Sequence, residues 1–252
     1  MYFEKLSCDE NDKDFSFRLI FLHGWGVDMN TLKPLASLFQ KEAEVWLVDM
    51  PGFGKTPPPK KVWDTSDYAA EVASFAHSLP KKTTVFVGHS FGGRVCIRLA
   101  SGFQEQTQGI ILIAGAGLLT RHSLFFKIKA FFIKYFSKIA KRLPFFNQMS
   151  FGSSDYRAAK GIMRRVFVKT VNENLEQTAK TITCPVCLIY GDKDTAAPAY
   201  FGEIYKNSMP QAVLSVLKNQ NHFSLIFEGK RQTAFLMDSF LKENFLTNDK
   251  KE

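Results

Sequence analysis

Short runs of apolar residues alternate along the chain with segments in which apolar residues recur every three or four positions. The runs are rich in β-branched and aromatic residues, and they predict strands at residues 15–22, 45–48, 84–87, 109–114, 186–190 and 212–216. Several runs are apolar almost throughout, as expected for strands that are covered on both faces. The alternation therefore predicts an α/β fold, with a mostly parallel sheet and helices on both of its faces.

The helical periodicity lies between these strands. Two helices have clear apolar faces, formed by Leu32, Leu35, Leu38 and Phe39 in the first and by Tyr68, Val72, Phe75, Ala76 and Leu79 in the second. Either Thr65 or Ser66 is a suitable N-cap for the second helix. A third helix runs through residues 94–99, and residues 229–243 predict a closing helix.

The alternation stops after Ala114, and the next strand begins near Pro185. This interval predicts an insertion, in which residues 124–143 have a helical period. We therefore assign residues 1–117 and 181–252 to the core of the fold and residues 118–180 to a helical cap. The cap carries too many lysines to span a bilayer.

The composition agrees with one globular unit. A chain of 252 residues with 45% hydrophobic content can bury one large core, so one domain with an insertion is expected. The first fifteen residues are polar and acidic and lack the apolar stretch of a secretory signal, which predicts a cytoplasmic protein.

A glycine-rich turn after the strand 84–87 is the strongest chemical signal. Gly88-His-Ser-Phe-Gly joins this strand directly to a helix. In that context the turn holds Ser90 in a strained, exposed position, and the glycines at 88 and 92 remove side chains that would clash there. The sequence therefore predicts Ser90 as a nucleophile above the carboxyl edge of the sheet.

A serine hydroxyl needs a base, and the base needs a group that fixes its tautomer. His222 is the histidine that lies on a loop after the last strand, downstream of Ser90. Tyr190-Gly-Asp-Lys-Asp supplies two candidates for the acid; Asp194 is preferred, and Asp192 stays an alternative because it resembles a turn former. The predicted catalytic residues are Ser90, Asp194 and His222.

Acyl transfer also requires two backbone N–H groups that point at the developing oxyanion. One is the N–H of Phe91, directly after the nucleophile, and the other is the N–H of Trp25 in His23-Gly-Trp-Gly. We predict that the side chains of Trp25, Phe91, His89 and Phe223 contact the substrate.

Two of the four cysteines, Cys184 and Cys187, form a CxxC pattern. The pair lies in an apolar strand, where a spacing of three directs the side chains to opposite faces, and no second pattern completes a four-ligand metal site. We predict no metal and no organic cofactor.

The motifs as a group resemble those of the α/β-hydrolase superfamily over nearly the whole chain: HGWG at 23–26, VDMPGFG at 48–54, GHSFGG at 88–93, GDKD at 191–194 and NHF at 221–223. The first two look most like the branch that contains pimeloyl-carrier-protein methyl ester esterase, although His89 stands where that branch often has tryptophan. The resemblance implies an α/β-hydrolase fold with a cap. It also implies Ser90, Asp194 and His222 as triad, Trp25 and Phe91 as oxyanion donors, and an ester, thioester or related acyl substrate.

The positive charge lies in the predicted cap. Residues 118–170 contain twelve Lys and Arg against one acid, Asp155; this net +11 leaves −2 of the total +9 for the other residues. The twelve are Arg121, Lys127, Lys129, Lys134, Lys138, Lys141, Arg142, Arg157, Lys160, Arg164, Arg165 and Lys169. Such a face docks an acidic carrier protein or an anionic membrane surface, or it is a solvated lid; the sequence favours neither, and nothing indicates nucleic acid.

The sequence thus predicts a serine hydrolase that cleaves a small-molecule, carrier-linked or lipid-like ester through an acyl-enzyme. Three alternatives stay open. The chain could be a lipase or thioesterase that docks on an anionic surface, a lyase or peroxidase-like variant of the same triad, or a non-catalytic binding protein with this fold.

Overall fold

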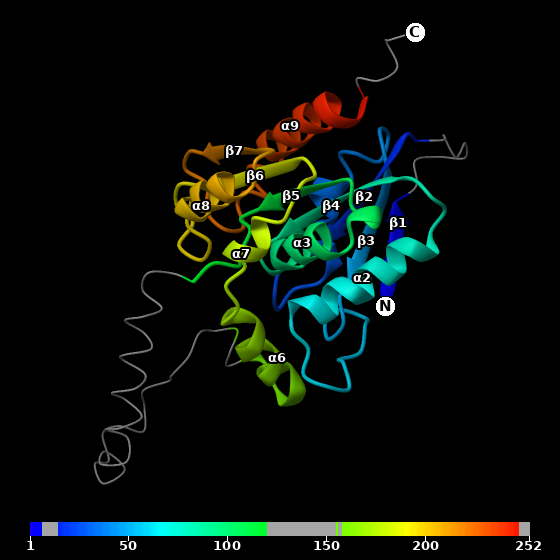
Figure 1. Ribbon diagram of the computed structural model, residues 1–252, viewed down its shortest axis with the longest axis vertical. Coiled ribbons are helices and arrows are strands. Elements are labelled where there is room, and N and C mark those ends of the chain that lie inside the picture. The colour runs from blue at the N-terminus through cyan, green and yellow to red at the C-terminus, as the bar shows by residue number, and fades with distance from the viewer. Residues whose placement is uncertain (7–14, 120–154, 156–157, 247–252) are drawn as a thin grey trace.

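A seven-stranded sheet, in the order β1-β3-β2-β4-β5-β6-β7, forms the centre of the computed structural model (Figure 1). The structure describes residues 1–6, 15–119, 155 and 158–246. β2 to β7 run parallel to their neighbours, and β1 is antiparallel to β3. The strands are β1 (Tyr2–Leu6), β2 (Phe17–Leu22), β3 (Glu44–Asp49), β4 (Thr83–His89), β5 (Gly109–Ile113), β6 (Val186–Gly191) and β7 (Ala212–Leu217). The predicted α/β-hydrolase fold with a mostly parallel sheet is confirmed.

The helices cover both faces of the sheet. They are η1 (Met29–Thr31), α1 (Lys33–Ala36), α2 (Thr65–Ser78), α3 (Phe91–Gly102), η2 (Gln104–Gln106), α6 (Gly161–Val171), α7 (Glu176–Ala179), α8 (Tyr200–Ser208), α9 (Lys230–Leu241) and the π-helical turn η4 (Lys242–Leu246). α3 contacts α2 and α7, α7 contacts α8, and α1 contacts α9 on the other side (Figure 1). The buried strands β2, β4, β5 and β6 supply the middle of the core.

The N-cap of α2 differs from the prediction. Asp64, rather than Thr65 or Ser66, is the cap: its carboxylate accepts the N–H groups of Ser66 and Asp67 at 2.9 and 3.1 Å. The Asp67 carboxylate in turn accepts the N–H of Asp64, which completes a capping box. Because Asp64 has an extended backbone, Thr65 is already the first helical residue.

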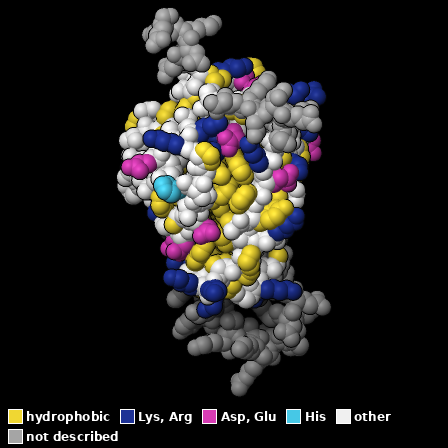
Figure 2. All heavy atoms as spheres, turned by 90° about the vertical axis from the view of Figure 1, so that its right-hand side faces the viewer, with side chains coloured by type: hydrophobic (Ala, Val, Ile, Leu, Met, Phe, Trp, Pro, Cys, Tyr) yellow, Lys and Arg dark blue, Asp and Glu magenta, His cyan; other side chains and the backbone are white. Residues whose placement is uncertain are grey.

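The strand β1 was not predicted from the sequence. It lies at the edge of the sheet, and its residues are mostly exposed, so its apolar pattern is weak. Phe3 nevertheless packs against Trp46 and Phe75, with ring centroids 5.5 and 4.6 Å apart. Figure 2 views the side that carries β1 and α2, where hydrophobic side chains form a band between lysines and arginines.

The interval between β5 and β6 contains α6 and α7. Most of the predicted cap, including the helical period at 124–143, lies outside the described residues, so the boundaries 118–180 stay a prediction. Within the described residues, no helix combines the length and the hydropathy that a bilayer-spanning segment requires.

The parallel register brings four loops to one edge of the sheet. Leu22 of β2 pairs with Gly88 of β4, and His89 pairs with Ile113 of β5. On the other side of β5, Gly191 of β6 pairs with Leu217 of β7. The segments that follow these strands, which contain Trp25, Ser90, Asp194 and His222, therefore begin at the same edge.

Truncation of Phe3 tests whether β1 contributes to the fold. Phe3→Ala should lower the free energy of unfolding by about 1–2 kcal/mol, because it removes a half-buried ring from two aromatic contacts. Urea titration measures the loss. Phe235 is 69% exposed, so Phe235→Ala is the matched control and should cost less than about 0.5 kcal/mol. Equal losses at the two positions would show that β1 adds no stability.

Candidate functional site

Ser90 occupies the single residue between β4 and α3 and has a positive φ of 52° with ψ of −107°. Three backbone hydrogen bonds hold it there. Its N–H donates to the Ile113 carbonyl at 3.1 Å, and its carbonyl accepts the N–H groups of Gly93 and Ala116 at 3.0 and 3.2 Å. The turn therefore keeps the serine in a conformation that non-glycine residues rarely adopt, as the sequence predicted.

The two flanking glycines are required by close backbone contacts. A Cβ atom on Gly88 would lie 2.5 Å from the carbonyl of Gly92, and one on Gly92 would lie 2.0 Å from the carbonyl oxygen of Leu22. The second contact packs the start of α3 against the end of β2. No side chain could be accommodated at either position without displacement of the backbone.

Asp194 and His222 form a hydrogen-bonded pair. The Nδ1 atom of His222 donates to the Asp194 carboxylate at 2.8 Å, so its Nε2 atom is left to accept a proton. The other carboxylate oxygen of Asp194 accepts the N–H groups of Ala196 and Ala197, which fixes the acid in place. Asp192, the alternative acid, is exposed at the surface and is not the partner of His222.

The loops that carry this pair are joined by their backbones. The N–H of Lys193 donates to the Gln220 carbonyl at 2.9 Å, and a Cβ on Gly191 would lie 2.2 Å from that same oxygen. Asn221 closes the second loop, since its side chain accepts the N–H groups of Phe223 and Ser224. These contacts fix the spacing between the loops of Asp194 and His222.

His89 links His222 to the turn that bears Ser90. Its Nε2 atom donates to the backbone carbonyl of His222 at 2.9 Å, and the two rings lie 4.8 Å apart. The imidazole of His222 is thus beside the nucleophile turn, although the Ser90 hydroxyl makes no hydrogen bond to it within the described residues. Such bonds are often long before substrate binds.

His89 itself is completely buried, and this burial lowers its pKa to about 3. The structure therefore gives no support to its predicted contact with substrate; the ring supports the His222 loop instead. Phe223 is 43% exposed and packs against both histidine rings, so it can still contact a substrate.

The side chains of Trp25 and Phe91, the two residues predicted to supply oxyanion donors, pack against each other. The Phe91 N–H belongs to the first turn of α3, where helix amides have no intrahelical partner. The two side chains meet with ring centroids 5.3 Å apart, and Trp25 also contacts Phe53 and Phe167 at 4.9 and 5.0 Å. These rings form an aromatic cluster above the start of α3.

His23 supports the loop that carries Trp25, a role that the sequence did not reveal. Its Nδ1 atom donates to the Gly24 carbonyl at 2.7 Å, and its Nε2 atom accepts the N–H of Met50 at 3.1 Å. Burial lowers the pKa of this ring, which matches its neutral hydrogen-bonding pattern. The ring therefore ties the loop after β2 to the segment after β3.

Asp49 at the end of β3 organises the second of these segments. Its buried carboxylate accepts the N–H groups of Met29 and Lys55 at 2.9 and 2.8 Å. Gly54 has a φ of 52°, and a Cβ there would lie 2.1 Å from the same carboxylate. The VDMPGFG segment is the sequence signal from which this loop could have been found.

An open groove of about 540 Å³ extends from the aromatic cluster. Its lining includes Trp25, Phe53, Lys160 and Met163, so α6 forms one side. A cavity of about 700 Å³ lies near the amino ends of β2 and β4. The described residues that line this cavity and the groove include none of Ser90, Asp194 and His222. The groove beside Trp25 is the better candidate for a substrate site, because it adjoins the predicted oxyanion donor.

The two cysteines of the CxxC pattern do not form a disulfide. Cys184 precedes β6 and Cys187 lies within it, and burial raises their pKa values to about 11 and about 12. Both thiols are therefore protonated at neutral pH, which is unfavourable for metal binding. In the part of the chain that the structure describes, no group of three or more His, Cys, Asp or Glu side chains is arranged to hold a metal ion.

Comparison with known families gives one clear match. The model of the alpha/beta hydrolase family matches residues 19–234, which is most of the chain. The chain belongs to the α/β-hydrolase family.

Individual relatives are more distant. The chain is 34% identical over 96 residues to the biotin biosynthesis bifunctional protein BioHC of Cellvibrio japonicus, and this match spans 38% of the chain but only 18% of that protein. It is 23% identical over 241 residues to the pimeloyl-[acyl-carrier protein] methyl ester esterase of Photorhabdus laumondii, with 87% of the chain and 89% of that protein covered. Among solved structures, MenH from S. aureus superposes with a TM-score of 0.73 at 17% identity over 96% of this chain and 98% of the other. At this identity the structural similarity establishes the fold alone.

The burial of His89 predicts a loss of stability in acid. In the unfolded chain a histidine titrates near pH 6.5, whereas in the native protein the pKa of His89 is about 3. Between these values the unfolded state binds a proton that the native state does not. The contribution of His89 to the free energy of unfolding is therefore fully present above about pH 6.5 and decreases toward pH 3. At pH 5 the slope from this residue is about 1.4 kcal/mol per pH unit.

Urea unfolding between pH 5 and 7 measures this slope. His89→Gln removes the titration and keeps an N–H donor for the His222 carbonyl, so the slope at pH 5 should fall by about 1.4 kcal/mol per pH unit. His77→Gln, at an exposed histidine, is the control and should leave the slope unchanged. An equal slope in the two variants would contradict the buried neutral state of His89.

Proposed function

We propose that this protein is a serine hydrolase that cleaves carboxylic esters through an acyl-enzyme. One observation carries the proposal: Ser90 is held at a positive φ at the N-terminus of α3, and the imidazole of His222, which Asp194 orients at 2.8 Å, contacts the ring of the preceding residue, His89. A nucleophile, a base and an orienting acid are the components of nucleophilic acyl transfer. Related proteins named as methyl ester esterases support the choice of ester substrates.

In the first step the Ser90 hydroxyl attacks the ester carbonyl while Nε2 of His222 takes its proton. The tetrahedral intermediate collapses, the imidazolium returns this proton to the leaving alkoxide, and the alcohol departs from an acyl-serine. In the second step His222 takes a proton from water, which attacks the acyl-serine. The acid then leaves, and the proton returns to the Ser90 oxygen.

The charge on the carbonyl oxygen is stabilised by the N–H groups of Phe91 and Trp25. The dipole of α3 adds to this, since its positive end lies at Ser90. The predicted loss on removal of one such donor is about 3 kcal/mol of transition-state stabilisation. The aromatic cluster of Trp25, Phe53, Phe91 and Phe167 is a suitable wall for an acyl chain.

Replacement of the nucleophile tests this function. Ser90→Ala should lower kcat for p-nitrophenyl acetate by at least about 10³-fold while the urea midpoint stays within error, because only the attacking oxygen is lost. A fluorophosphonate probe should label the unchanged protein and not the variant. Absence of labelling in the unchanged protein would favour the non-catalytic binding protein, and activity of Ser90→Ala within tenfold of the unchanged protein would exclude this nucleophile.

We further propose that a basic surface on the predicted cap docks an acidic acyl carrier protein. Among the described residues of this surface, Lys160, Arg164, Arg165 and Lys169 accompany a single acid, Asp155. Lys160 and Arg165 are exposed, and Lys160 lines the groove that adjoins Trp25. The name of the Photorhabdus laumondii relative includes a carrier-linked ester, which favours this partner over a membrane.

Charge reversal distinguishes a surface that docks a carrier protein from a solvated lid. Lys160→Glu combined with Arg165→Glu should raise KM about tenfold for a dicarboxylic acyl methyl ester on acyl carrier protein, because like charges then face each other. KM for the same acyl group on pantetheine should not change. The control is Lys81→Glu combined with Lys206→Glu, which changes the net charge by the same amount at exposed lysines that precede β4 and β7. It should not change KM for either substrate. Equal KM changes for both substrates would contradict docking.

A further inference from the structure

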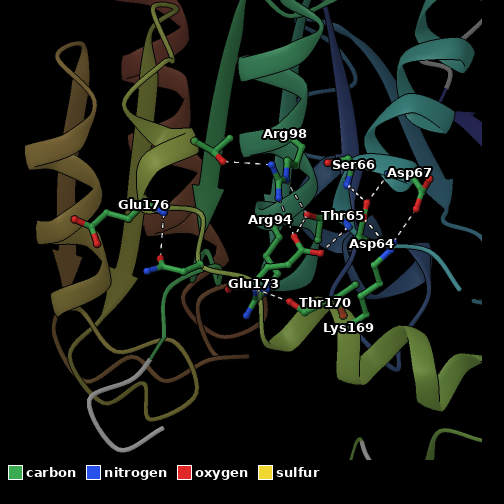
Figure 3. Close-up of polar contacts among 12 residues, drawn as sticks. Asp64, Thr65, Ser66, Asp67, Arg94, Arg98, Lys169, Thr170, Glu173 and Glu176 are labelled. Carbon is green, nitrogen blue, oxygen red and sulfur yellow. Dashed lines mark hydrogen bonds and ion pairs between the residues drawn. The ribbon is translucent and has the colours of Figure 1, made fainter. Parts of the chain in front are cut away.

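We propose that Glu173 and Arg98 are positioning residues that fix α6 on the nucleophile-bearing helix α3, and that they thereby set the acyl-chain preference of the site. This inference rests on the proposed ester hydrolysis. α6 contacts the aromatic cluster, so its placement determines the shape of one wall of the substrate groove. Figure 3 shows the side chains that hold the end of α6.

Glu173 joins the segment after α6 to the start of α2. Its carboxylate accepts the backbone N–H of Thr65 at 3.0 Å and the hydroxyl of the same residue. Arg98 of α3 donates to this carboxylate at 3.3 Å (Figure 3). A negative charge at the N-terminus of a helix is favourable, so Glu173 is bound both by a cation and by the dipole of α2.

Arg98 connects three parts of the chain. Besides Glu173, its guanidinium donates to the Thr65 hydroxyl at 3.1 Å and to the Thr178 hydroxyl in α7 at 3.3 Å. The side chains of Arg98 and Glu173 are only 29% and 14% exposed, so water screens this pair less than it screens a surface pair. Because the planar guanidinium fixes the directions of its donors, the network selects one arrangement of the three segments.

Arg94, one turn closer to Ser90, binds the end of α6 directly. Its buried guanidinium donates to the carbonyls of Thr170 and Glu173 at 2.8 and 3.3 Å. The Thr170 carbonyl lies at the C-terminal end of α6, where a positive charge is favourable, and Glu173 follows the helix directly after its C-cap. At the rim, Lys169 and Asp64 add an ion pair at 3.0 Å between α6 and the cap of α2.

The same helix, α6, borders the substrate groove. Val166 and Thr170 are the buried residues of α6, and Met163 and Phe167 lie on the same face of this helix. Phe167 contacts Trp25 at 5.0 Å between ring centroids, and Met163 packs so closely on Gly52 that a Cβ there would lie 2.4 Å from it. A shift of the α6 C-terminus would therefore move Phe167 and Met163 relative to the oxyanion loop.

If Glu173 and Arg98 contributed only stability, their loss would affect long and short substrates equally. Apolar residues could bury this area equally well, and a buried ion pair by itself is weak evidence for stability. The polar network differs from an apolar contact in that it fixes α6 in one register on α3. Loss of the Glu173 charge should therefore change KM more for long esters, which reach α6, than for acetate esters, which do not.

Steady-state kinetics on p-nitrophenyl esters of two to twelve carbons test this role. Glu173→Gln and Arg98→Gln should each raise KM for the longest esters about five- to tenfold, with kcat for acetate within twofold of the unchanged protein. Arg98→Lys keeps the charge without the fork and should give an intermediate KM. Asp238→Asn removes an ion pair between α9 and Lys242, whose side chain is 60% exposed, and serves as the control, with no change in chain-length profile. An unchanged ratio of long to short esters in Glu173→Gln would overturn the specificity role.

Amide hydrogen exchange gives a second readout that does not require turnover. Glu173→Gln should accelerate exchange in peptides from 161–171 about tenfold, because the C-terminus of α6 loses its anchor, while peptides from α9 should not change and so report an intact fold. Unchanged exchange in α6 would overturn the anchoring. Turnover by the unchanged protein tests ester hydrolysis separately, so failure of the proposed function and failure of the anchor give different results.

Discussion

The conformation of one residue determines the geometry of the site. Ser90 must leave β4 and begin α3 at once, and the positive φ that this requires costs about 1–3 kcal/mol for a non-glycine residue. The surrounding structure compensates this cost through the hydrogen bonds from Gly93 and Ala116 to its carbonyl and through the contact of Gly92 with the end of β2. The hydroxyl is consequently held at the helix N-terminus, where the unpaired amides and the dipole stabilise negative charge.

The parallel sheet makes such a turn useful. Because the carboxyl ends of β2, β4, β6 and β7 lie on one edge, residues that are far apart in sequence meet there without long connections. Backbone contacts then fix the relative positions of the loops: Lys193 binds the carbonyl of Gln220, His89 binds that of His222, and His23 receives the N–H of Met50. The loops are held by neighbours in space rather than by rigid sequences of their own.

The sequence predicted the parts of this arrangement that have a local signal. The apolar runs located β2 to β7, and the strand-turn-helix context located Ser90. β1 was missed because an edge strand with Glu4 and Lys5 has little apolar periodicity. The N-cap of α2 was placed one or two residues late, since Asp64, Thr65 and Ser66 are all good caps and only the backbone conformation distinguishes them.

Roles that depend on distant partners could not be predicted. The neutral state of His89 follows from complete burial under a loop that is 133 residues further along the chain, and the role of His23 requires an amide 27 residues away. Glu173 belongs to no motif, and its proposed role depends on contacts with Thr65, 108 residues earlier, and with the two arginines on α3.

The arginines of α3 connect the turn at Ser90 to the groove beside Trp25. Arg94 and Arg98 are four residues apart and lie along one side of α3, and Ser90 directly precedes this helix. Ser90 is the proposed nucleophile, and the two arginines bind the end of α6 and the segment that follows it, while Phe167 of α6 contacts Trp25. Since α3 begins directly after Ser90 and also binds the end of α6, one helix connects the turn at Ser90 to the groove beside Trp25.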